Sequence, residues 1–480
     1  MERILSVAQM RSADKFTIEN LGVDSDELVY RAGKGVADEI LKRFLGGRVL
    51  VCVGEGNNGK DGRIIADILS KKHGFSVAVL SVSNGIFKLF DKKYDIIVDC
   101  IFGTGLNREV EGKYRTAIEK INSSGAYIVA CDIASGLNGD TGRVMGVAVK
   151  ANLTIAVQEY KLGHFLNDGI DYSGETVVKD IGISVWDDDC VKRLNLSDVS
   201  RLFMPRIKHV NKGDFGKVAI VGGSKIYTGS ALLSANALSA LKMGTGYSNL
   251  VVAESLLSVY AGKNPECLVT PVKDNDGFIT FNESDFISLL KYDSIAVGMG
   301  MGVSEETYKV VSYLISNFEG RLLIDADGLN SLAKYGLNVL KDKKCTVILT
   351  PHVGEFSRLI NVDIGEILNN PIKYVKQFAL EYGVLVLYKD SVSIFSNGDS
   401  VYLNTTGCSG LAKAGSGDVL SGIIAGLLAR VDDCIDAVVG GSFLFGLTGE
   451  WVMKEQNEYT MTASDVIGAL PKVIKSLQTV

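Results

Sequence analysis

Residues 48–62 read RVLVCVGEGNNGKDG, an apolar run followed at once by a loop rich in glycine and amide side chains. The run from Arg48 to Val53 predicts a buried strand, and the amphipathic stretch from Asp61 to Lys72 predicts a helix after it. A strand, a glycine-rich turn and a helix in this order are the unit from which parallel α/β sheets are built. The predicted fold class for this region is therefore α/β.

The same alternation extends along the chain in both directions from this segment. In the first half we expect strands at 76–80, 95–98, 127–130 and 153–157, a helix at 113–121, and two helices, 6–20 and 25–44, before the first strand. In the second half we expect strands at 217–221, 294–297, 322–324, 346–349 and 384–388, helices at 230–243, 305–318, 371–382 and 418–428, and two more to the end. The pattern predicts two doubly wound domains, the second larger than the first.

A change of character near residue 200 marks the boundary between the two domains. Every proline lies at or after Pro205, and the segment from Asp187 through Arg206 is polar, charged and without a long apolar period. We place the split between Asn195 and Lys212, which gives domains of 1–204 and 208–480.

Composition excludes several classes of protein. The 480 residues are 46% hydrophobic and 22% charged, as in a globular chain, and a net charge of -6 without long charge runs argues against nucleic-acid binding. No apolar stretch reaches the length of a membrane span, and nothing at the N-terminus has the pattern of a signal peptide. The eight cysteines are scattered, without a CxxC pair or zinc-ligand spacing. We expect a cytoplasmic protein with reduced thiols and small-molecule substrates.

Polar residues follow three of the strands expected in the first half. They are the loop Gly54–Gly62, then Asp99 with Gly103–Gly105, then Asp132 with Ser135 and Gly136. Ligands of open α/β sheets bind beyond the carboxyl ends of the strands, so these residues are expected on one rim. Each aspartate could instead cap the turn or helix that follows it. As a group, with Asn57 and Asn58, they suit a hard cation or a base beside a polar substrate.

The first loop also has the glycine-lysine spacing of a phosphate-binding P-loop. That motif requires Ser or Thr after the lysine to hold magnesium, and this chain has Asp61, whose charge would repel a triphosphate. We therefore favour, at most, a single phosphate or a pyrophosphate at this loop.

Four segments of the first half resemble the N-terminal YjeF-type domain, the NAD(P)H-hydrate epimerase family. They are Glu27–Gly33, Asn57–Gly62, Asp99–Leu106 and Asp132–Leu137, with Lys60 where the family usually has Gly and Ala134 where it usually has Pro. The resemblance implies a Rossmann-like three-layer domain that binds substrate through Asn57, Asn58, Gly59, Lys60, Asp61, Gly103, Thr104, Gly105, Leu106, Asn107, Arg108, Glu109 and Asp132. It also implies Asp132 as the catalytic acid/base, and a potassium ion near Asn58, Asp99 and Ser135.

In the second half, Leu411–Leu420 places Gly-Ser-Gly-Asp at the start of an apolar helix. Free amides and the helix dipole there stabilise negative charge, and Asp418 could take the proton from an attacking hydroxyl during phosphoryl transfer. An N-cap role would explain Asp418 but not the glycines before it. His352 follows another strand end and Pro351, and we favour ligand contact over a structural role for it.

These segments, with Lys212–Gly216, Val221–Ser224, Thr350–Phe356 and Asn404–Ala412, resemble the ADP-dependent NAD(P)H-hydrate dehydratases of the ribokinase-like superfamily. Cys408 stands where that family commonly has Asn. The resemblance implies substrate contacts by Ala231, Gly302, His352 and Asp418, with Asp418 catalytic. It also implies a nucleotide site formed by Lys389, Asp390, Ser391, Val392, Ser393 and Gly417, with Mg²⁺ bound alongside ADP.

Together the two resemblances imply repair of hydrated NADH and NADPH. The first domain would interconvert the R and S hydrates, and the second would dehydrate the S hydrate at the expense of ADP, giving AMP and phosphate. The substrates implied are NADHX, NADPHX and ADP, and the N-terminal helices suggest a homo-oligomer. The alternative is a ribokinase-like small-molecule kinase with a non-catalytic dinucleotide-binding N-terminal module, because Gly417 and Asp418 alone serve either outcome.

Overall fold

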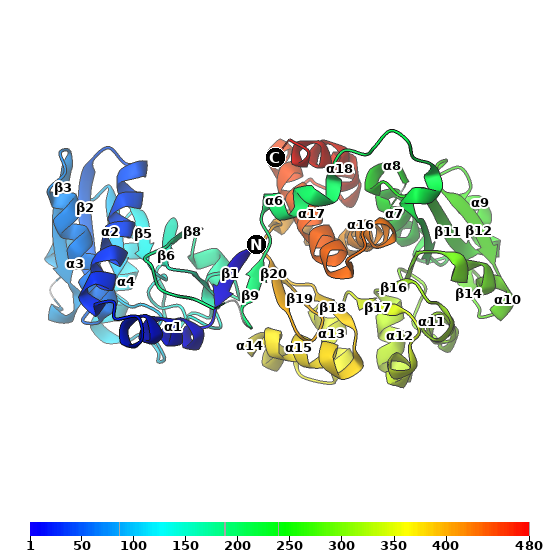
Figure 1. The fold of residues 1–480 in the computed structure, drawn as a ribbon, viewed down its shortest axis with the longest axis horizontal. Helices are drawn as coiled ribbons and strands as arrows, with labels where there is room; N and C mark the ends of the chain where they lie inside the picture. Colours follow the sequence, from blue (N-terminus) through cyan, green and yellow to red (C-terminus); the bar gives the residue numbers. More distant parts are fainter. Residues whose placement is uncertain (86, 187–188, 239, 480) are drawn as a thin grey trace. The chain divides into compact units, whose positions relative to one another are not determined.

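The computed structural model describes residues 1–85, 87–186, 189–238 and 240–479. The chain divides into two compact units, and Figure 1 colours it along the sequence. The N-terminal unit is Arg3–Val191, and the C-terminal unit is Lys192–Val480 together with Met1–Glu2. Within the described ranges, no helix combines the length and the apolar character needed to cross a membrane.

The N-terminal unit is built on a six-stranded parallel sheet. Its strands are β2 (Gly47–Val53), β3 (Phe75–Ser81), β4 (Ile96–Cys100), β5 (Tyr127–Cys131), β6 (Leu153–Val157) and β8 (Glu175–Lys179), in the order β3-β2-β4-β5-β6-β8. The predicted α/β class is confirmed, and every strand expected in this half is present. β8 was not expected, because its sequence ETVVK has a charged residue at each end.

Helices cover both faces of this sheet because alternate residues of each strand point to opposite sides. In β2, Val49, Val51 and Val53 pack in one core with α2 (Ser25–Arg43) and α3 (Asn57–Ser70). Leu50 and Cys52 pack in the other core with α4 (Gly112–Asn122). The unit is completed by α1 (Val7–Glu19), α5 (Gly169–Tyr172) and the short strand β7 (Tyr160–Lys161), which pairs in parallel with the Ile4–Leu5 end of β1 (Glu2–Leu5).

The C-terminal unit contains a larger mixed sheet. Its parallel part runs β12-β11-β10-β15-β16-β17-β18, with bounds Leu268–Val272, Tyr247–Ala253, Lys217–Val221, Ser294–Val297, Arg321–Ile324, Thr346–Leu349 and Leu385–Tyr388. β19 (Ser393–Ser396) and β20 (Val401–Asn404) continue it as antiparallel strands. The sequence pattern misses β11, which carries the buried polar Ser248 and Asn249, and β12, which contains Pro271. The hairpin β19–β20 was not expected either, because polar residues end both of its strands, SIFS and VYLN.

Helices lie on both faces of this second sheet as well (Figure 1). One set is α7 (Thr228–Leu238), α8 (Ala240–Met243), α16 (Ser416–Arg430), α17 (Cys434–Glu455) and α18 (Ala463–Leu477). The other is α11 (Glu305–Asn317), α12 (Asp327–Tyr335), α13 (Val353–Ile360), α14 (Ile364–Asn369) and α15 (Pro371–Tyr382). Short elements complete the unit: α6 (Leu196–Ser200), α9 (Leu257–Tyr260), α10 (Glu283–Phe286) and the hairpin β13 (Asp274–Asn275) and β14 (Phe278–Ile279). From Val419 to Leu428 every residue of α16 is buried, so this helix forms the centre of the unit.

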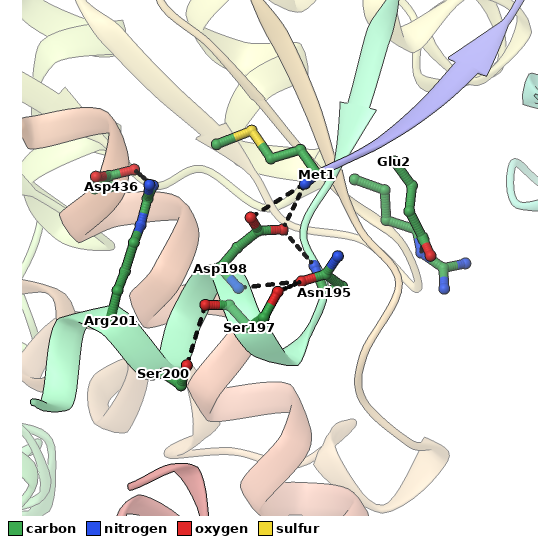
Figure 2. Close-up of polar contacts among 9 residues, drawn as sticks. Met1, Glu2, Asn195, Ser197, Asp198, Ser200, Arg201 and Asp436 are labelled. Atoms are coloured by element: carbon green, nitrogen blue, oxygen red, sulfur yellow. Dashed lines mark hydrogen bonds and ion pairs between the residues drawn. The ribbon is translucent and has the colours of Figure 1, made fainter. Parts of the chain in front are cut away.

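The first two residues of the chain fold with the C-terminal unit. The Met1 ammonium lies 3.0 Å from the Asp198 carboxylate, and Asn195 caps the start of α6 beside it (Figure 2). α6 packs against α17 and α18, and Arg201 pairs with Asp436 at 2.6 Å. The boundary expected between 204 and 208 therefore lies inside the C-terminal unit, because the polar stretch before it contains this anchored helix. Asp187 and Asp188, also assigned to the boundary, lie outside the described residues.

Candidate active sites

A cavity of about 650 Å³ opens at the carboxyl ends of β2, β4 and β5 in the N-terminal unit. Residues from three predicted strand ends line it: Asn57, Asn58, Asp61, Gly103, Thr104, Gly105, Leu106, Asn107, Arg108 and Asp132. Helix α1 contributes Met10, Arg11 and Asp14, and Lys161 reaches the cavity from β7. Most of the candidates expected in this half therefore lie together, as predicted from the rule that ligands bind beyond the carboxyl ends of parallel strands.

Five of the expected residues do not line this cavity. Gly59 packs against the backbone of Gly54, and Lys60 is exposed. The Glu109 carboxylate lies beside Gly146. Asp99 and Ser135 are buried beneath the rim, where they bond to each other.

The segment expected to be a loop at 54–62 is largely helical. α3 begins at Asn57, with Gly56 as its N-cap, so Asn57–Gly62 form its first turns. The glycines that suggest a loop are needed for close packing, because Gly59 approaches the Gly54 carbonyl and Gly62 approaches Val53 and Cys100. The helix predicted from Asp61 therefore starts earlier than expected.

Gly59→Ala is expected to destabilise the N-terminal unit by about 2 to 3 kcal/mol, since an added Cβ would overlap the Gly54 carbonyl oxygen. Gly56→Ala is the matched control, because a Cβ there meets nothing within 4 Å and the loss should stay below about 1 kcal/mol. In differential scanning calorimetry the Gly59→Ala transition should fall by roughly 5 to 10 °C. Equal melting temperatures for the two variants would contradict the close packing.

A buried polar network joins Asn58, Asp99 and Ser135. The Ser135 hydroxyl donates to Asp99 at 2.7 Å, and the Phe102 amide donates to that hydroxyl at 2.8 Å. The Asn58 amide group donates to the carbonyls of Phe102 (2.8 Å) and Cys131 (3.2 Å). Burial raises the pKa of Asp99 to about 6, against the lowering effect of its bonds from Ser135.

The Asn58 side-chain oxygen stands out in this network. It is buried and has no hydrogen-bond partner among the described residues. A buried amide oxygen without a donor is costly unless it accepts from something else, and carbonyl-type oxygens are ligands for hard cations. Asp99, in contrast, already accepts bonds at both of its oxygens, from Ser135 and Ile101.

Asp132 is held in a left-handed conformation with φ at 68°, which is uncommon for a residue with a side chain. Its carboxylate pairs with the ammonium group of Lys161 and accepts from the Val157 amide at 3.1 Å. His164 Nε2 lies 2.8 Å from the Asp132 carbonyl. Lys161 and His164 were not identified from the sequence, although they follow the strand 153–157 and the strand-end rule could have found them.

Asp61 is a second carboxyl group in the cavity. Burial and the charge of Asp132 raise its pKa to about 7, and Lys60 partly offsets them. A carboxyl group with this pKa can carry a proton at neutral pH, as a general acid must. The cavity therefore contains two carboxyl groups in different environments, the arrangement used for paired acid and base roles.

In the C-terminal unit the expected residues gather around the start of α16. Gly415 is the N-cap of this helix with φ at 90°, and Asp418 lies in its first turn. Burial and the negative charge of Asp325 raise the pKa of Asp418 to about 6, while a hydrogen bond with Ser230 and the charge of Lys389 lower it. Asp418 is thus a partly buried base at a helix N-terminus, as phosphoryl transfer to a hydroxyl requires.

Lys389 is the cation of this site. Its ammonium group lies 2.8 Å from Asp325, whose other oxygen accepts from Ser421 at 2.7 Å. Burial favours loss of its proton, but the charges of Asp325 and Glu355 outweigh this and raise the pKa of Lys389. A Cβ at Gly417 would lie 3.4 Å from the Lys389 ammonium, so the predicted nucleotide residues at 389 and 417 are neighbours.

The other residues expected to bind nucleotide or substrate in this unit lie near the ends of strands. Asp390, Ser391 and Val392 form the turn between β18 and β19, and Ser393 begins β19. The Gly302 amide donates to Asp327 at 2.8 Å. Ala326, directly before Asp327, has φ at 50°. Strain of this kind is often concentrated at functional sites.

His352 and Ala231 differ in their accessibility. His352 caps α13 by accepting from the Gly354 amide at 3.0 Å, and its side chain is 53% exposed. Burial and the charges of Lys389 and Arg358 lower its pKa, which favours the neutral imidazole. Ala231 is fully buried in the core, one turn into α7.

Comparisons with known proteins agree with the fold and identify the family of the chain. Residues 218–472 match the family described as NAD(P)H-hydrate dehydratase, and residues 25–89 and 81–163 match the family described as YjeF-related protein N-terminus. Because the first match spans more than half of the chain, and curated relatives match nearly all of it, the chain belongs to the NAD(P)H-hydrate repair family.

Two curated relatives are named bifunctional NAD(P)H-hydrate repair enzyme. The protein of Thermofilum pendens is 32% identical, over 99% of this chain and 97% of its own length. The protein of Dictyoglomus turgidum is 34% identical, over 89% of each chain. The family resemblance expected from the sequence is therefore confirmed.

Solved structures match the C-terminal half. An ADP/ATP-dependent NAD(P)H-hydrate dehydratase of Bacillus subtilis, co-crystallised with ATP and Mg²⁺, superposes with a TM-score of 0.51 at 25% identity, over 60% of this chain and 99% of its own. A ribokinase-like superfamily protein of Enterococcus faecalis gives 0.52 at 21% identity, over 62% and 99%. The predicted ribokinase-like fold is confirmed.

Proposed function

We propose that the chain repairs hydrated NADH and NADPH with two catalytic domains, an epimerase in the N-terminal unit and an ADP-dependent dehydratase in the C-terminal unit. The observation that carries the proposal is that one chain contains two clusters of polar residues, one around Asp132 and one around Asp418. Each cluster lies at an edge of its own sheet. Relatives that match most of the chain are named bifunctional NAD(P)H-hydrate repair enzymes, which supports the assignment of two activities.

In the dehydratase, Asp418 takes the proton of the C6 hydroxyl of the S hydrate. The hydroxyl oxygen then attacks the β-phosphorus of ADP, supplied as its Mg²⁺ complex, and AMP leaves. Loss of a C5 proton and cleavage of the C6–O bond release phosphate and restore the C5–C6 double bond of the reduced nicotinamide. The amides at the start of α16 stabilise charge on the transferring phosphoryl group, and Lys389 and Gly417 hold the nucleotide.

In the epimerase, Asp132 takes the proton of the C6 hydroxyl as the bond between C6 and the ring nitrogen breaks. The electron pair of that bond moves to the nitrogen, which accepts a proton from Asp61, and C6 becomes an aldehyde carbon. Rotation and closure on the other face reverse both proton transfers, giving the other epimer. No external oxidant or reductant is needed. The carboxyl groups of Asp132 and Asp61 line one cavity, which makes such an exchange geometrically reasonable.

A potassium ion fits the Asn58 network of the N-terminal unit. Asn58 supplies a buried oxygen without a donor and Ser135 a hydroxyl, while Asp99 contributes negative charge next to them. The ion would supply positive charge near the substrate phosphates. Asp99 accepts hydrogen bonds from the Ile101 amide and from the amide and hydroxyl of Ser135, so in our proposal it contributes the negative charge of the site.

Replacing KCl by LiCl at equal ionic strength should slow epimerisation several-fold and lower the melting temperature of the N-terminal unit by a few degrees, because binding to the native state stabilises it. The two readouts are the amounts of R and S hydrate in reactions quenched at set times and the melting temperature from calorimetry. Identical results in the two salts would contradict a potassium site at Asn58.

The proposal is tested by following absorbance at 340 nm while the protein acts on mixed R and S hydrates of NADH, with ADP, Mg²⁺ and K⁺. Recovery beyond the S fraction, dependent on ADP, is the expected result. Recovery that stops at the S fraction would contradict the proposed epimerase activity. An organic phosphate product without NADH would instead favour the alternative, a small-molecule kinase. Cytoplasmic location and a homo-oligomeric state stay predictions of the sequence.

A further inference from the structure

Lys161 is a buried cation in the epimerase cavity that the proposed mechanism does not yet use. Its side chain is 1% exposed, although it lines the cavity. Lysine is almost never fully buried without a partner, because its charge loses hydration. Its ammonium group donates to Asp132 Oδ1 and, at 2.6 Å, to the Val157 carbonyl.

The turn that carries Lys161 also fixes the backbone of Asp132. The Lys161 amide donates to His164 Nδ1 at 3.1 Å, so the proton of the neutral imidazole lies on Nε2. Nε2 then donates to the Asp132 carbonyl at 2.8 Å. Burial, with the charge of Lys161, lowers the pKa of His164 to about 4, which keeps this ring neutral. Residues 161–164 therefore hold Asp132 at both its carboxylate and its carbonyl.

The contacts of the Asp132 carboxylate are one-sided. Among the described residues, the two hydrogen bonds that it accepts, from Lys161 and from the Val157 amide, both go to Oδ1. Oδ2 is left as the oxygen that can face a substrate in the cavity that Asp132 lines. A carboxylate with one oxygen anchored and the other open is oriented for proton abstraction.

We propose that Lys161 is a positioning residue of the epimerase: it anchors Asp132 Oδ1 and presents Oδ2 to the substrate hydroxyl. The inference rests on the proposed function, since it assumes that Asp132 is the base. The other groups that face Asp132 are His164, which is neutral, Asp61 and Cys131. Arg11, Asp14 and Arg108 line the same cavity. Only Lys161 pairs with it among the charged groups of that cavity that the structure describes.

The test compares Lys161→Met with the wild type by measuring R-to-S conversion over a range of substrate concentrations. Loss of the cation should lower kcat about 100-fold and change KM little, because the missing effect is on proton transfer. Lys150→Met, at an exposed lysine of the same unit, should match the wild type.

Dehydration of the S hydrate serves as the internal control, since it depends on the other unit. Where Lys161→Met does not fold by calorimetry, Lys161→Gln is used, because it is neutral and can still donate to the Val157 carbonyl. An unchanged kcat, a rise in KM alone, or loss of folding in both variants would overturn the positioning role. Failure of the wild type to interconvert the hydrates would reject the epimerase itself, so the two failures are distinguishable.

Discussion

Asp418→Asn is expected to abolish dehydration of the S hydrate, lowering kcat by about 10³-fold, within the range that a positioned general base provides. The amide keeps the size of the side chain and can still bond with Ser230, which contacts Asp418 in this structure. It cannot accept the hydroxyl proton. Because burial and Asp325 raise the pKa of Asp418 to about 6, the wild-type rate should also fall as the pH drops below about 6, where the base becomes protonated.

The measurement is ADP-dependent recovery of absorbance at 340 nm from purified S hydrate. Asp432→Asn is the matched control, since Asp432 is exposed just beyond the other end of α16. Interconversion of R and S should be unchanged in both variants, because it takes place in the N-terminal unit. A variant that retained a tenth or more of wild-type activity would show that another group takes the proton.

Asp132→Asn is expected to reduce consumption of the R hydrate to its spontaneous rate while dehydration of the S hydrate stays intact. The expected loss is about 10² to 10³-fold, since the variant removes the proton acceptor and leaves Lys161 buried without its counter-charge. Chromatographic separation of the two epimers follows the reaction without depending on the dehydratase.

The Asp132 variant needs a control for folding, because losing a buried ion pair destabilises a protein. Calorimetry should show whether the N-terminal unit still melts cooperatively. Asp171→Asn, an exposed position in the same unit, should behave as the wild type. Unchanged consumption of the R hydrate by a folded Asp132→Asn would instead make the N-terminal unit a passive module.

Most of the sheet could be predicted, because strands such as β2 and β10 are continuous apolar runs with clear ends. The strands that escaped prediction depend on tertiary contacts. In β11, Asn249 is buried and bonds to Tyr292 and Thr270, which a local pattern cannot reveal. Gly59 and Gly62 show the opposite error, since their spacing suggests a loop while packing requires them inside a helix.

The rim residues could be found because parallel strands all end at one edge of the sheet. Asp132 directly follows a strand, and Asp418 lies in the first turn of a helix that faces strand ends. Their positions in the sequence therefore predicted that they lie at the rim of a sheet. Lys161 was harder to find, since its role depends on a two-residue strand and on an ion pair across 29 positions. The strand-end rule points to the segment after 153–157, but the pairing of Lys161 with Asp132 is a tertiary contact that composition and periodicity do not show.

The attachment of Met1 and Glu2 to the C-terminal unit has a consequence for synthesis of the chain. A ribosome makes the protein from its N-terminus, so the whole Arg3–Val191 unit emerges before Asp198, the partner of the Met1 ammonium, exists. The Arg3–Val191 unit can therefore fold during translation before Met1 and Glu2 reach their native contacts, because the segment around Asp198 follows that unit in the sequence.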